Sequence, residues 1–133
     1  MTESDRHANT VNKIKGLLRM LDAQIWENDN ERGKGGWRFP EIITEKGKRE
    51  YTADIFARLK SCAMVDFEID FMFKGSPLAQ IAMLFRDACL KSFGIVTIRL
   101  TPKMCDGMTK EQLQEEIDYW LNNRMRIAKE IVQ

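Results

Sequence analysis

Two stretches of the chain alternate between apolar and polar residues, which is the pattern of a β-strand with one buried face. The first runs over residues 51–60 and is interrupted only by Phe56. The second runs over residues 65–73, and its polar positions include Asp66, Glu68 and Asp70. With the residues SCAM as the turn, the two runs are expected to pair as a hairpin. Apolar residues four apart leave a helix open for residues 51–60, but the alternation favours a strand.

Three further segments repeat their apolar residues at spacings of three and four, which indicates amphipathic helices. They are residues 10–26, 76–94 and 109–133. In the second helix, Ser76 is a natural N-cap, Pro77 suits the first position and Gly94 suits the end. Its expected buried face consists of Leu78, Ile81, Ala82, Phe85, Ala88 and Cys89. Thr109 and Gln112 have the spacing of a capping box that opens the third helix.

Two shorter strands complete the predicted order of elements. Residues 39–44 are predicted to form an edge strand, because Pro40 cannot donate to a central ladder, and residues 95–101 alternate as a final strand. The order is therefore α-β-β-β-α-β-α, an α+β fold with a small, mainly antiparallel sheet and helices packed on one face. The other sheet face is then open to water or to a partner. Residues 1–9 are expected to be a disordered tail, and residues 10–133 a single α+β domain.

Composition narrows the class of protein. The chain has 133 residues, of which 44% are hydrophobic and 31% charged, as in ordinary folded domains. Its net charge of +1 means that binding to nucleic acid would need a local basic patch. No apolar stretch approaches the ~18 residues of a membrane span, so no membrane contact is expected. The three cysteines, Cys62, Cys89 and Cys105, lack the spacing of a zinc site and are expected to be reduced thiols in a cytoplasmic protein.

The single histidine, His7, lies in the predicted tail. Ser-His-Asp and Cys-His catalysis, and histidine-rich metal sites, require that group in a folded pocket. No catalytic residue is therefore assigned and no cofactor is expected. This favours a non-enzymatic protein, with an enzyme as the alternative.

The acidic residues of the second alternating run raise a metal-site hypothesis. Asp66, Glu68 and Asp70 share one strand face, and a Mg²⁺-dependent nuclease needs converging carboxylates. Residues two apart on a strand are separated by about 6.5–7 Å, so three in a row do not converge by themselves. Arg58 and Lys60 are expected opposite the first acids, where ion pairs would stabilise a solvated face. We favour the solvated face and keep the nuclease-like enzyme as an alternative.

A basic and aromatic segment, residues 32–51, is a second candidate site. Cations interleaved with rings are typical of proteins that bind single-stranded nucleic acid. The predicted contact residues are Arg32, Lys34, Trp37, Arg38, Lys46, Lys48 and Arg49. The glycines of this segment match neither a P-loop nor a dinucleotide fingerprint. The competing interpretation is a solvated loop with Trp37 and Phe39 in the core.

The last predicted helix is a third candidate, because its apolar stripe is wide. The predicted partner-binding residues are Tyr119, Trp120, Arg124 and Met125. Most such stripes pack on their own sheet, but a terminal helix can also dock on another chain. Our leading hypothesis is a small intracellular, non-enzymatic binding protein that forms a homo-oligomer or docks on a protein partner through this helix and the open sheet face. A single-stranded nucleic-acid-binding accessory protein is the alternative.

Overall fold

The computed structural model describes residues 2–27, 36–39, 51–70 and 76–122. Its helices are α1 (Glu3–Met20), α2 (Pro77–Ser92), α3 (Pro102–Cys105) and α4 (Lys110–Asn122). Its strands are β1 (Gln24–Trp26), β2 (Trp37–Arg38), β3 (Thr52–Ala53), β4 (Ile55–Arg58), β5 (Met64–Ile69) and β6 (Ile95–Leu100). None of the helices in the described ranges has both the length and the apolar content that a bilayer crossing requires. The predicted α+β class is confirmed.

Four strands form one sheet in the order β1-β4-β5-β6. Strand β4 runs antiparallel to both β1 and β5, and β6 returns parallel to β5 after α2. Strands β2 and β3 pair as a separate antiparallel ribbon. The predicted hairpin, crossover helix and returning strand are therefore confirmed. The first strand of the sheet is β1 instead of the predicted strand 39–44, and we had expected its residues Ile25 and Trp26 at the end of a helix. Of residues 39–44, only Phe39 lies within the described residues, and it belongs to no strand.

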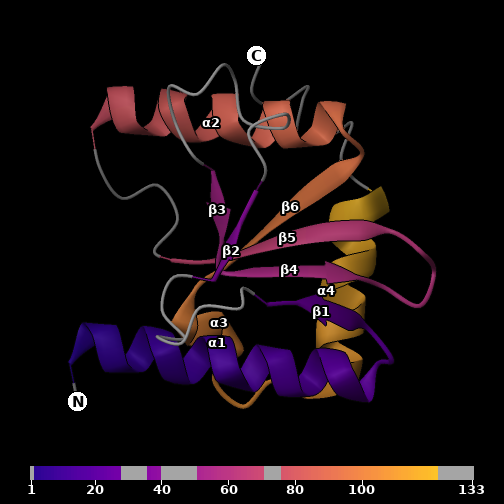
Figure 1. Cartoon of the computed structure of the whole chain (residues 1–133). Coiled ribbons are helices and arrows are strands. Elements are labelled where there is room, and N and C mark those ends of the chain that lie inside the picture. The colour runs from indigo at the N-terminus through magenta and orange to yellow at the C-terminus, as the bar shows by residue number, and fades with distance from the viewer. Residues whose placement is uncertain (1, 28–35, 40–50, 71–75, 123–133) are drawn as a thin grey trace.

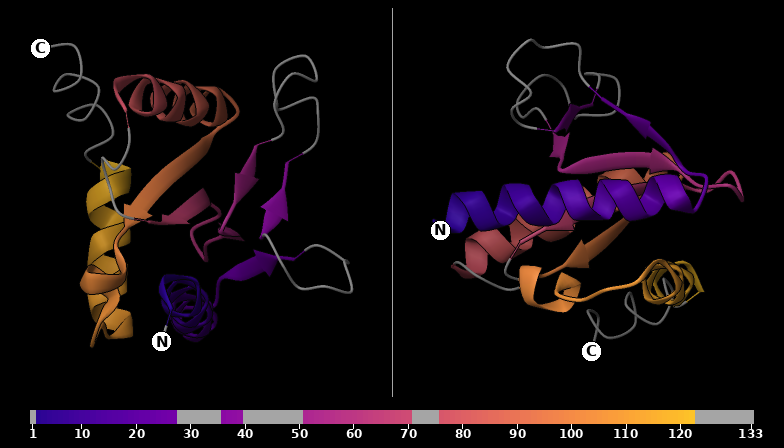
Figure 2. Two further views of the ribbon diagram at one scale, coloured as in Figure 1. Left: turned by 90° about the vertical axis from the view of Figure 1, so that its left-hand side faces the viewer. Right: turned by 90° about the horizontal axis from the view of Figure 1, so that it is seen from below.

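Helices cover both faces of the sheet, which differs from the predicted arrangement. Figure 1 shows α2 above the strands and α1 below them, and Figure 2 shows the same layers from two other sides. Along β5, Phe67 points into the cluster that α1 and α4 close, whereas Asp66 contacts Arg86 of α2. Asp66 is fully buried. The expected open sheet face is therefore occupied by α2.

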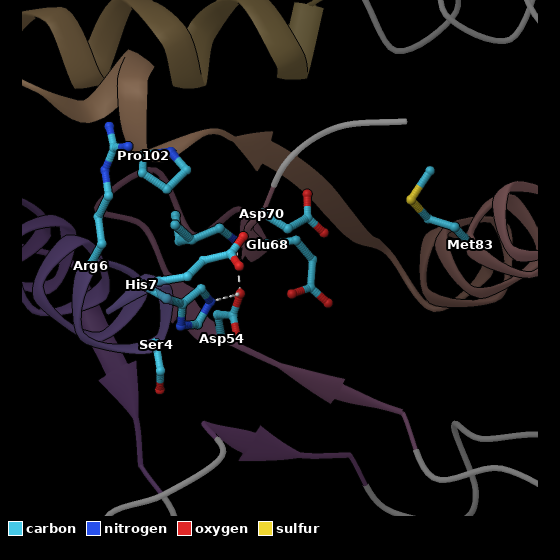
Figure 3. A pocket seen from close by; sticks show the side chains of 10 residues that line it. Ser4, Arg6, His7, Asp54, Glu68, Asp70, Met83 and Pro102 are labelled. Carbon is cyan, nitrogen blue, oxygen red and sulfur yellow. Dashed lines mark hydrogen bonds and ion pairs between the residues drawn. The ribbon is translucent and has the colours of Figure 1, made fainter. Parts of the chain in front are cut away.

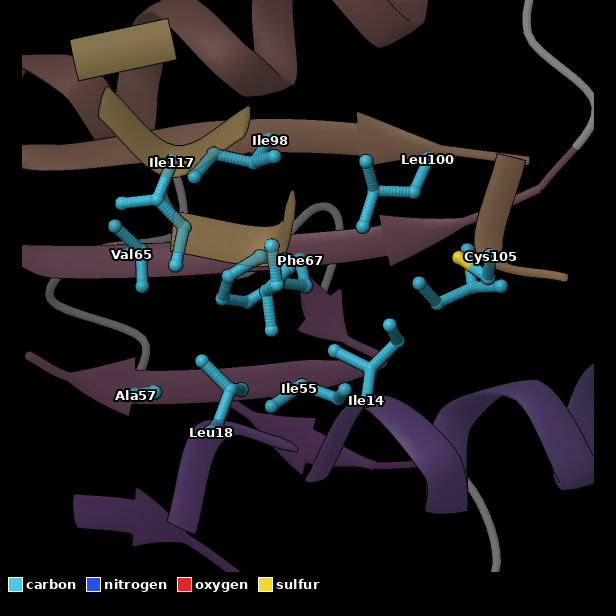
Figure 4. Packing of buried hydrophobic residues seen from close by; sticks show 12 residues of the cluster. Ile14, Leu18, Ile55, Ala57, Val65, Phe67, Ile98, Leu100, Cys105 and Ile117 are labelled. Atoms are coloured by element: carbon cyan, nitrogen blue, oxygen red, sulfur yellow. The ribbon is translucent and has the colours of Figure 1, made fainter. Parts of the chain in front are cut away.

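The larger core lies between the sheet and the helices α1 and α4. Phe67 of β5 sits among Ile14 and Leu18 of α1, Leu113 and Ile117 of α4, and the apolar residues of β4 and β6 (Figure 4). Full burial of one such side chain contributes ~1.5–3 kcal/mol. This cluster is therefore the main source of stability.

A smaller apolar cluster lies on the opposite face, next to the ribbon of β2 and β3. The Phe56 ring contacts the rings of Trp26 and Phe39, with centroids 4.8 and 4.9 Å away. The ribbon is tight at Gly36, whose φ is +61° and where a Cβ would lie 2.0 Å from the carbonyl oxygen of Ala53. Only glycine fits there, so this position fixes the approach of β2 to β3.

Helix α1 begins at Glu3, which corrects the prediction of a disordered tail over residues 1–9. Thr2 caps the helix, because its hydroxyl accepts the Asp5 N–H at 3.0 Å and the Asp5 carboxylate accepts the Thr2 N–H at 3.2 Å. This capping box stabilises the start of the helix, although the segment is polar. It also brings His7 into the folded part of the chain.

The predicted start and end of α2 and the predicted start of α4 are confirmed. Ser76 caps α2 by accepting the Ala79 N–H at 3.2 Å, and Gly94 follows its end with a φ of +81°. Thr109 and Gln112 form the predicted capping box of α4. Residues 123–133, which we predicted to continue that helix, lie outside the described residues.

Candidate functional site

Helix α2 turns Arg86 and Asp87 toward the sheet and its large apolar side chains toward solvent. Its only buried residue is Leu90. Its exposed apolar residues are Leu78, Ile81, Leu84 and Phe85, with Leu78 at 78% and Phe85 at 70% exposure. They recur at spacings that place them on one side of the helix, and we call them the outer stripe. The prediction that Leu78, Ile81 and Phe85 form the buried face is therefore wrong.

Arg86 holds α2 to the neighbouring strands. Its guanidinium donates to Asp66 Oδ2 at 2.7 Å and to the Thr52 carbonyl oxygen at 2.7 Å. The same group lies 2.6 Å from Glu68 Oε1. One cation thus contacts both acids at the centre of β5 and the backbone of β3.

A second arginine connects β6 to α2. Arg99 donates two hydrogen bonds to the Asp87 carboxylate, from Nε at 3.0 Å and from Nη2 at 2.8 Å. Its Nη1 donates to Asp70 Oδ2 at 3.3 Å. Two-pronged contacts of this kind are directional as well as strong. They fix the rotation of α2 about its own axis.

The acids Asp66, Glu68 and Asp70 do share one strand face, as predicted, but their expected partners are wrong. The hairpin register places Phe56 opposite Asp66, and Arg58 opposite Met64. Arg58 donates to Cys62 Sγ instead. Among the residues that the structure describes, no group of three or more potential ligands is arranged to hold a metal ion. The nuclease-like alternative receives no support from this geometry.

Carboxyl groups outnumber cations around Arg86 and Arg99, and the pKa values of three of these carboxyl groups are raised. Burial raises the pKa of Glu68 to about 9, the charges of Asp66 and Asp54 add to the shift, and Arg86 opposes it. Burial also raises the pKa of Asp66 against the hydrogen bonds from Arg86 and Thr97. The pKa of Asp70 is raised as well, mainly by burial. The raised pKa favours the protonated form of Glu68, although Arg86 lies beside it.

A pocket of about 530 Å³ opens beside this network. We call it the acidic pocket and define it by His7, Asp54, Glu68, Asp70, Met83 and Pro102. His7 Nε2 lies 3.2 Å from Asp54 Oδ2, and the same oxygen accepts the Ile69 N–H at 2.8 Å. Figure 3 shows His7 pointing from α1 toward Asp54, with Glu68 and Asp70 beside them and Met83 approaching from α2.

The sequence indicated this pocket only in part. The acids of β5 were visible as candidates, but His7 was assigned to a tail. The Thr2–Asp5 spacing of a capping box is the signal that could have placed His7 on a helix. Ser4 also lines the pocket, yet no hydrogen bond joins it to His7 within the described structure, so a Ser-His-Asp triad is not assembled.

The predicted nucleic-acid contacts fall mostly outside the described residues. This applies to Arg32, Lys34, Lys46, Lys48 and Arg49. Trp37 is half-buried and stacks on Phe56 with centroids 6.0 Å apart, and Phe39 is buried. The competing interpretation is thus confirmed for these two rings. Arg38 is exposed on β2. Nucleic-acid binding by this segment stays a prediction.

The predicted partner-binding residues divide in the same way. Tyr119 is exposed, while Trp120 packs against the larger core and donates from Nε1 to Glu116 at 3.1 Å. Arg124 and Met125 lie outside the described residues. The largest apolar exposure is therefore on α2 rather than on the described part of α4.

Comparisons with protein-family models, with curated proteins and with solved structures find no match for this chain. The roles of the outer stripe and of the contacts that hold α2 are inferred from their own geometry.

Proposed function

We propose that this chain is a small non-enzymatic binding protein that self-associates through the outer stripe of α2. The supporting observation is that Leu78, Ile81 and Phe85 are exposed together on one helix, whose Arg86 and Asp87 face inward. Contiguous apolar surface on a protein commonly marks an interaction site. The proposal keeps the predicted class of function and replaces the open sheet face, which α2 covers, with the outer side of α2.

A second copy of the chain suits the outer stripe because the stripe is self-complementary. The charged groups Arg86 and Asp87 point to the sheet, so two stripes can meet about a two-fold axis without opposing like charges. In an antiparallel pair, the amino end of each α2 lies near the carboxyl end of the other, which the helix dipoles favour. No polar group of the stripe would be buried without a partner.

The expected affinity follows from the size of the stripe. Each fully buried Leu, Ile or Phe contributes ~1.5–3 kcal/mol, and the partly exposed side chains of two stripes together contribute on the order of 10 kcal/mol. Association itself costs about 4–15 kcal/mol. At the lowest of these costs about 6 kcal/mol remains, which gives a weak dimer with a Kd of roughly 40 µM or weaker.

Sedimentation velocity tests the proposal with a matched pair of variants. Phe85→Lys places a charge on the outer stripe, whereas Met20→Lys places the same charge on an exposed apolar residue of α1. Over concentrations from about 10 to about 500 µM, which span the expected Kd, the wild type and Met20→Lys should sediment faster as concentration rises. Phe85→Lys should remain a monomer. Circular dichroism of both variants verifies the fold.

Two results would contradict self-association through this stripe. One is a wild-type protein that stays monomeric over the whole concentration range. The other is a Phe85→Lys variant that dimerises as strongly as Met20→Lys, because the contact must then lie elsewhere.

We also propose a cytoplasmic location. Cys62, Cys89 and Cys105 are thiols rather than disulfides, and Cys62 is exposed. Exposed thiols persist in reducing compartments. Fractionation of cells that express a tagged chain tests this, and a chain recovered only in an oxidising compartment would contradict it.

A further inference from the structure

Helix α2 buries less apolar surface than the helices on the other side of the sheet. Leu90 is its one buried residue, whereas α1 buries Ile14 and Leu18, and the described part of α4 buries Leu113 and Ile117. Figure 1 shows α2 on the opposite side of the sheet from α1. Because apolar burial supplies most of the stability of a packed helix, α2 is held less firmly than α1 and α4.

The contacts between α2 and the sheet are mainly charged. Arg86 lies 2.7 Å from Asp66 and 2.6 Å from Glu68, and Asp87 lies 2.8 Å from Arg99. Asp66 is fully buried, yet its Oδ1 has no hydrogen-bond partner within the described structure. Buried ion pairs repay their desolvation only when every polar atom is paired. This charged layer therefore directs α2 to its position but adds little to its stability.

Both ends of α2 leave it room to move. In its first turns Leu78, Ile81 and Phe85 point to solvent, and the buried Leu90 lies close to its carboxyl end. Gly94, which joins the helix to β6, has a φ of +81°, and no described atom lies within 4 Å of the place that a Cβ would take. The helix can thus pivot near Gly94 without a clash at that residue.

We propose that α2 is a strap, a helix that opens from the sheet as a unit while the larger core stays folded. Residues 77–89 leave the sheet together, because the charged layer holds them only in the closed form. Opening uncovers the face of β5 and β6 that carries Asp66, Thr97 and Arg99. The open form is a small population under native conditions, so unfolding by denaturant remains a single step.

The strap also regulates the outer stripe, and this consequence alone rests on the proposed function. A detached α2 no longer presents Leu78, Ile81 and Phe85 on a rigid surface. The closed form is therefore the one that dimerises. The opening itself needs no second copy of the chain.

Native-state hydrogen exchange, read by mass spectrometry, tests the proposal. A detached helix of this length is marginal in water, so its amide protons exchange when the strap opens. At about 5 µM protein, well below the expected Kd, the result does not depend on self-association. Peptides from α2 should be protected at least about tenfold less than peptides that contain Leu18 or Ile117. Low concentrations of urea should bring the amides of α2 to one common free energy of opening.

Variants separate opening of the strap from unfolding of the whole chain. Ile117→Val removes a methyl group from the larger core, whose contacts are present in both the closed and the open form. It should lower the protection of Leu18 roughly two- to tenfold and leave the protection of α2 unchanged.

Arg99→Met removes a cation whose contact with Asp87 exists only in the closed form. It should lower the protection of α2 at least about tenfold. Arg58→Met makes the same chemical change at an exposed position of β4 and should leave that protection unchanged.

Three results would overturn the strap. One is a wild-type α2 that exchanges as slowly as the larger core. Another is an Ile117→Val variant in which α2 and Leu18 lose protection by the same factor, because α2 then opens only when the whole chain unfolds. The third is an Arg99→Met variant whose α2 is as well protected as that of Arg58→Met.

Discussion

Glu68 combines a buried position with more acidic neighbours than cationic ones. Its side chain faces Arg86 at 2.6 Å, but that guanidinium also contacts Asp66 and Asp87. A single positive charge shared among three carboxyl groups cannot keep all of them ionised at low cost. At the scale of the residue, the native structure therefore favours the protonated form of Glu68.

The Glu68→Gln variant tests this proton through its effect on stability. The folded pKa is about 9 against 4.5 for an unperturbed glutamate, so the folded state binds this proton more tightly than the unfolded state. The stabilisation is fully present below the unfolded pKa and is lost as the pH rises toward the folded pKa. In that window the free energy of unfolding should fall by up to ~1.4 kcal/mol per pH unit in the wild type.

Glutamine resembles the protonated acid and does not titrate. The stability of Glu68→Gln relative to wild type should therefore be greater at pH 8 than at pH 5, measured by urea denaturation. Glu115→Gln, on the exposed face of α4, is the control. A Glu68→Gln difference that is equal at both pH values would contradict a raised pKa.

At the scale of the element, α2 is held by ion pairs rather than by a buried apolar face. Only Leu90 of this helix is buried, while Arg86 and Asp87 make the contacts to β5 and β6. Ion pairs in buried positions need both partners, because a lone buried charge is very costly. The attachment of α2 therefore depends strongly on Arg86.

Arg86→Leu should lower the free energy of unfolding by about 3–5 kcal/mol, because it leaves Asp66 buried without a cation. Adding Asp66→Asn to the same chain should recover part of the loss. Arg58→Leu, at an exposed position of β4, should cost less than about 1 kcal/mol. Chemical denaturation of the three variants measures these differences. An Arg86→Leu variant as stable as Arg58→Leu would show that the network does not hold α2.

The residues at which α2 begins and ends could be predicted from the sequence, but the side of α2 that faces the sheet could not. Ser76, Pro77 and Gly94 act through neighbouring backbone groups, so their local pattern was sufficient. Which side of the helix turns inward depends on the sheet face that it packs against. That face carries Asp66, Thr97 and Arg99, whose burial requires polar partners from α2.

The candidate site was harder to predict for the same reason. The acids of β5 were found by their alternation, and so was the hairpin that contains Asp66. Their partners Arg86 and Arg99 come from later elements, and the crossover that places them beside β5 leaves no short-range signal. His7 was misplaced because polar composition was given more weight than the Thr2–Asp5 capping box.

At the scale of the whole molecule, the two apolar clusters share the same strands. Ile55 and Phe67 pair across the hairpin and belong to the larger core. Phe56, the next residue of β4, points to the opposite face and belongs to the cluster with Trp26 and Trp37. Neither cluster can lose β4 or β5 without disrupting the other. The described residues should therefore unfold in one cooperative step.

Phe67→Ala should lower the free energy of unfolding by about 3–5 kcal/mol, because it leaves a cavity in the larger core. In a Trp120→Phe background, fluorescence reports Trp26 and Trp37 on the opposite face, while far-ultraviolet circular dichroism reports the helices. Both transitions should move together. Phe93→Ala, at an exposed site, is the control and should shift neither by much. A fluorescence transition that stays in place would show that the clusters unfold independently.

The larger core joins the first described helix to the last one. Ile14 and Leu18 of α1 meet Leu113 and Ile117 of α4 across nearly the whole described chain. Contacts between residues so far apart in sequence slow folding. As the chain is synthesised, Phe67 emerges long before α4 exists to cover it. Until then its sheet face is protected by α1 alone, and the growing chain is at its most vulnerable to aggregation just before α4 is made.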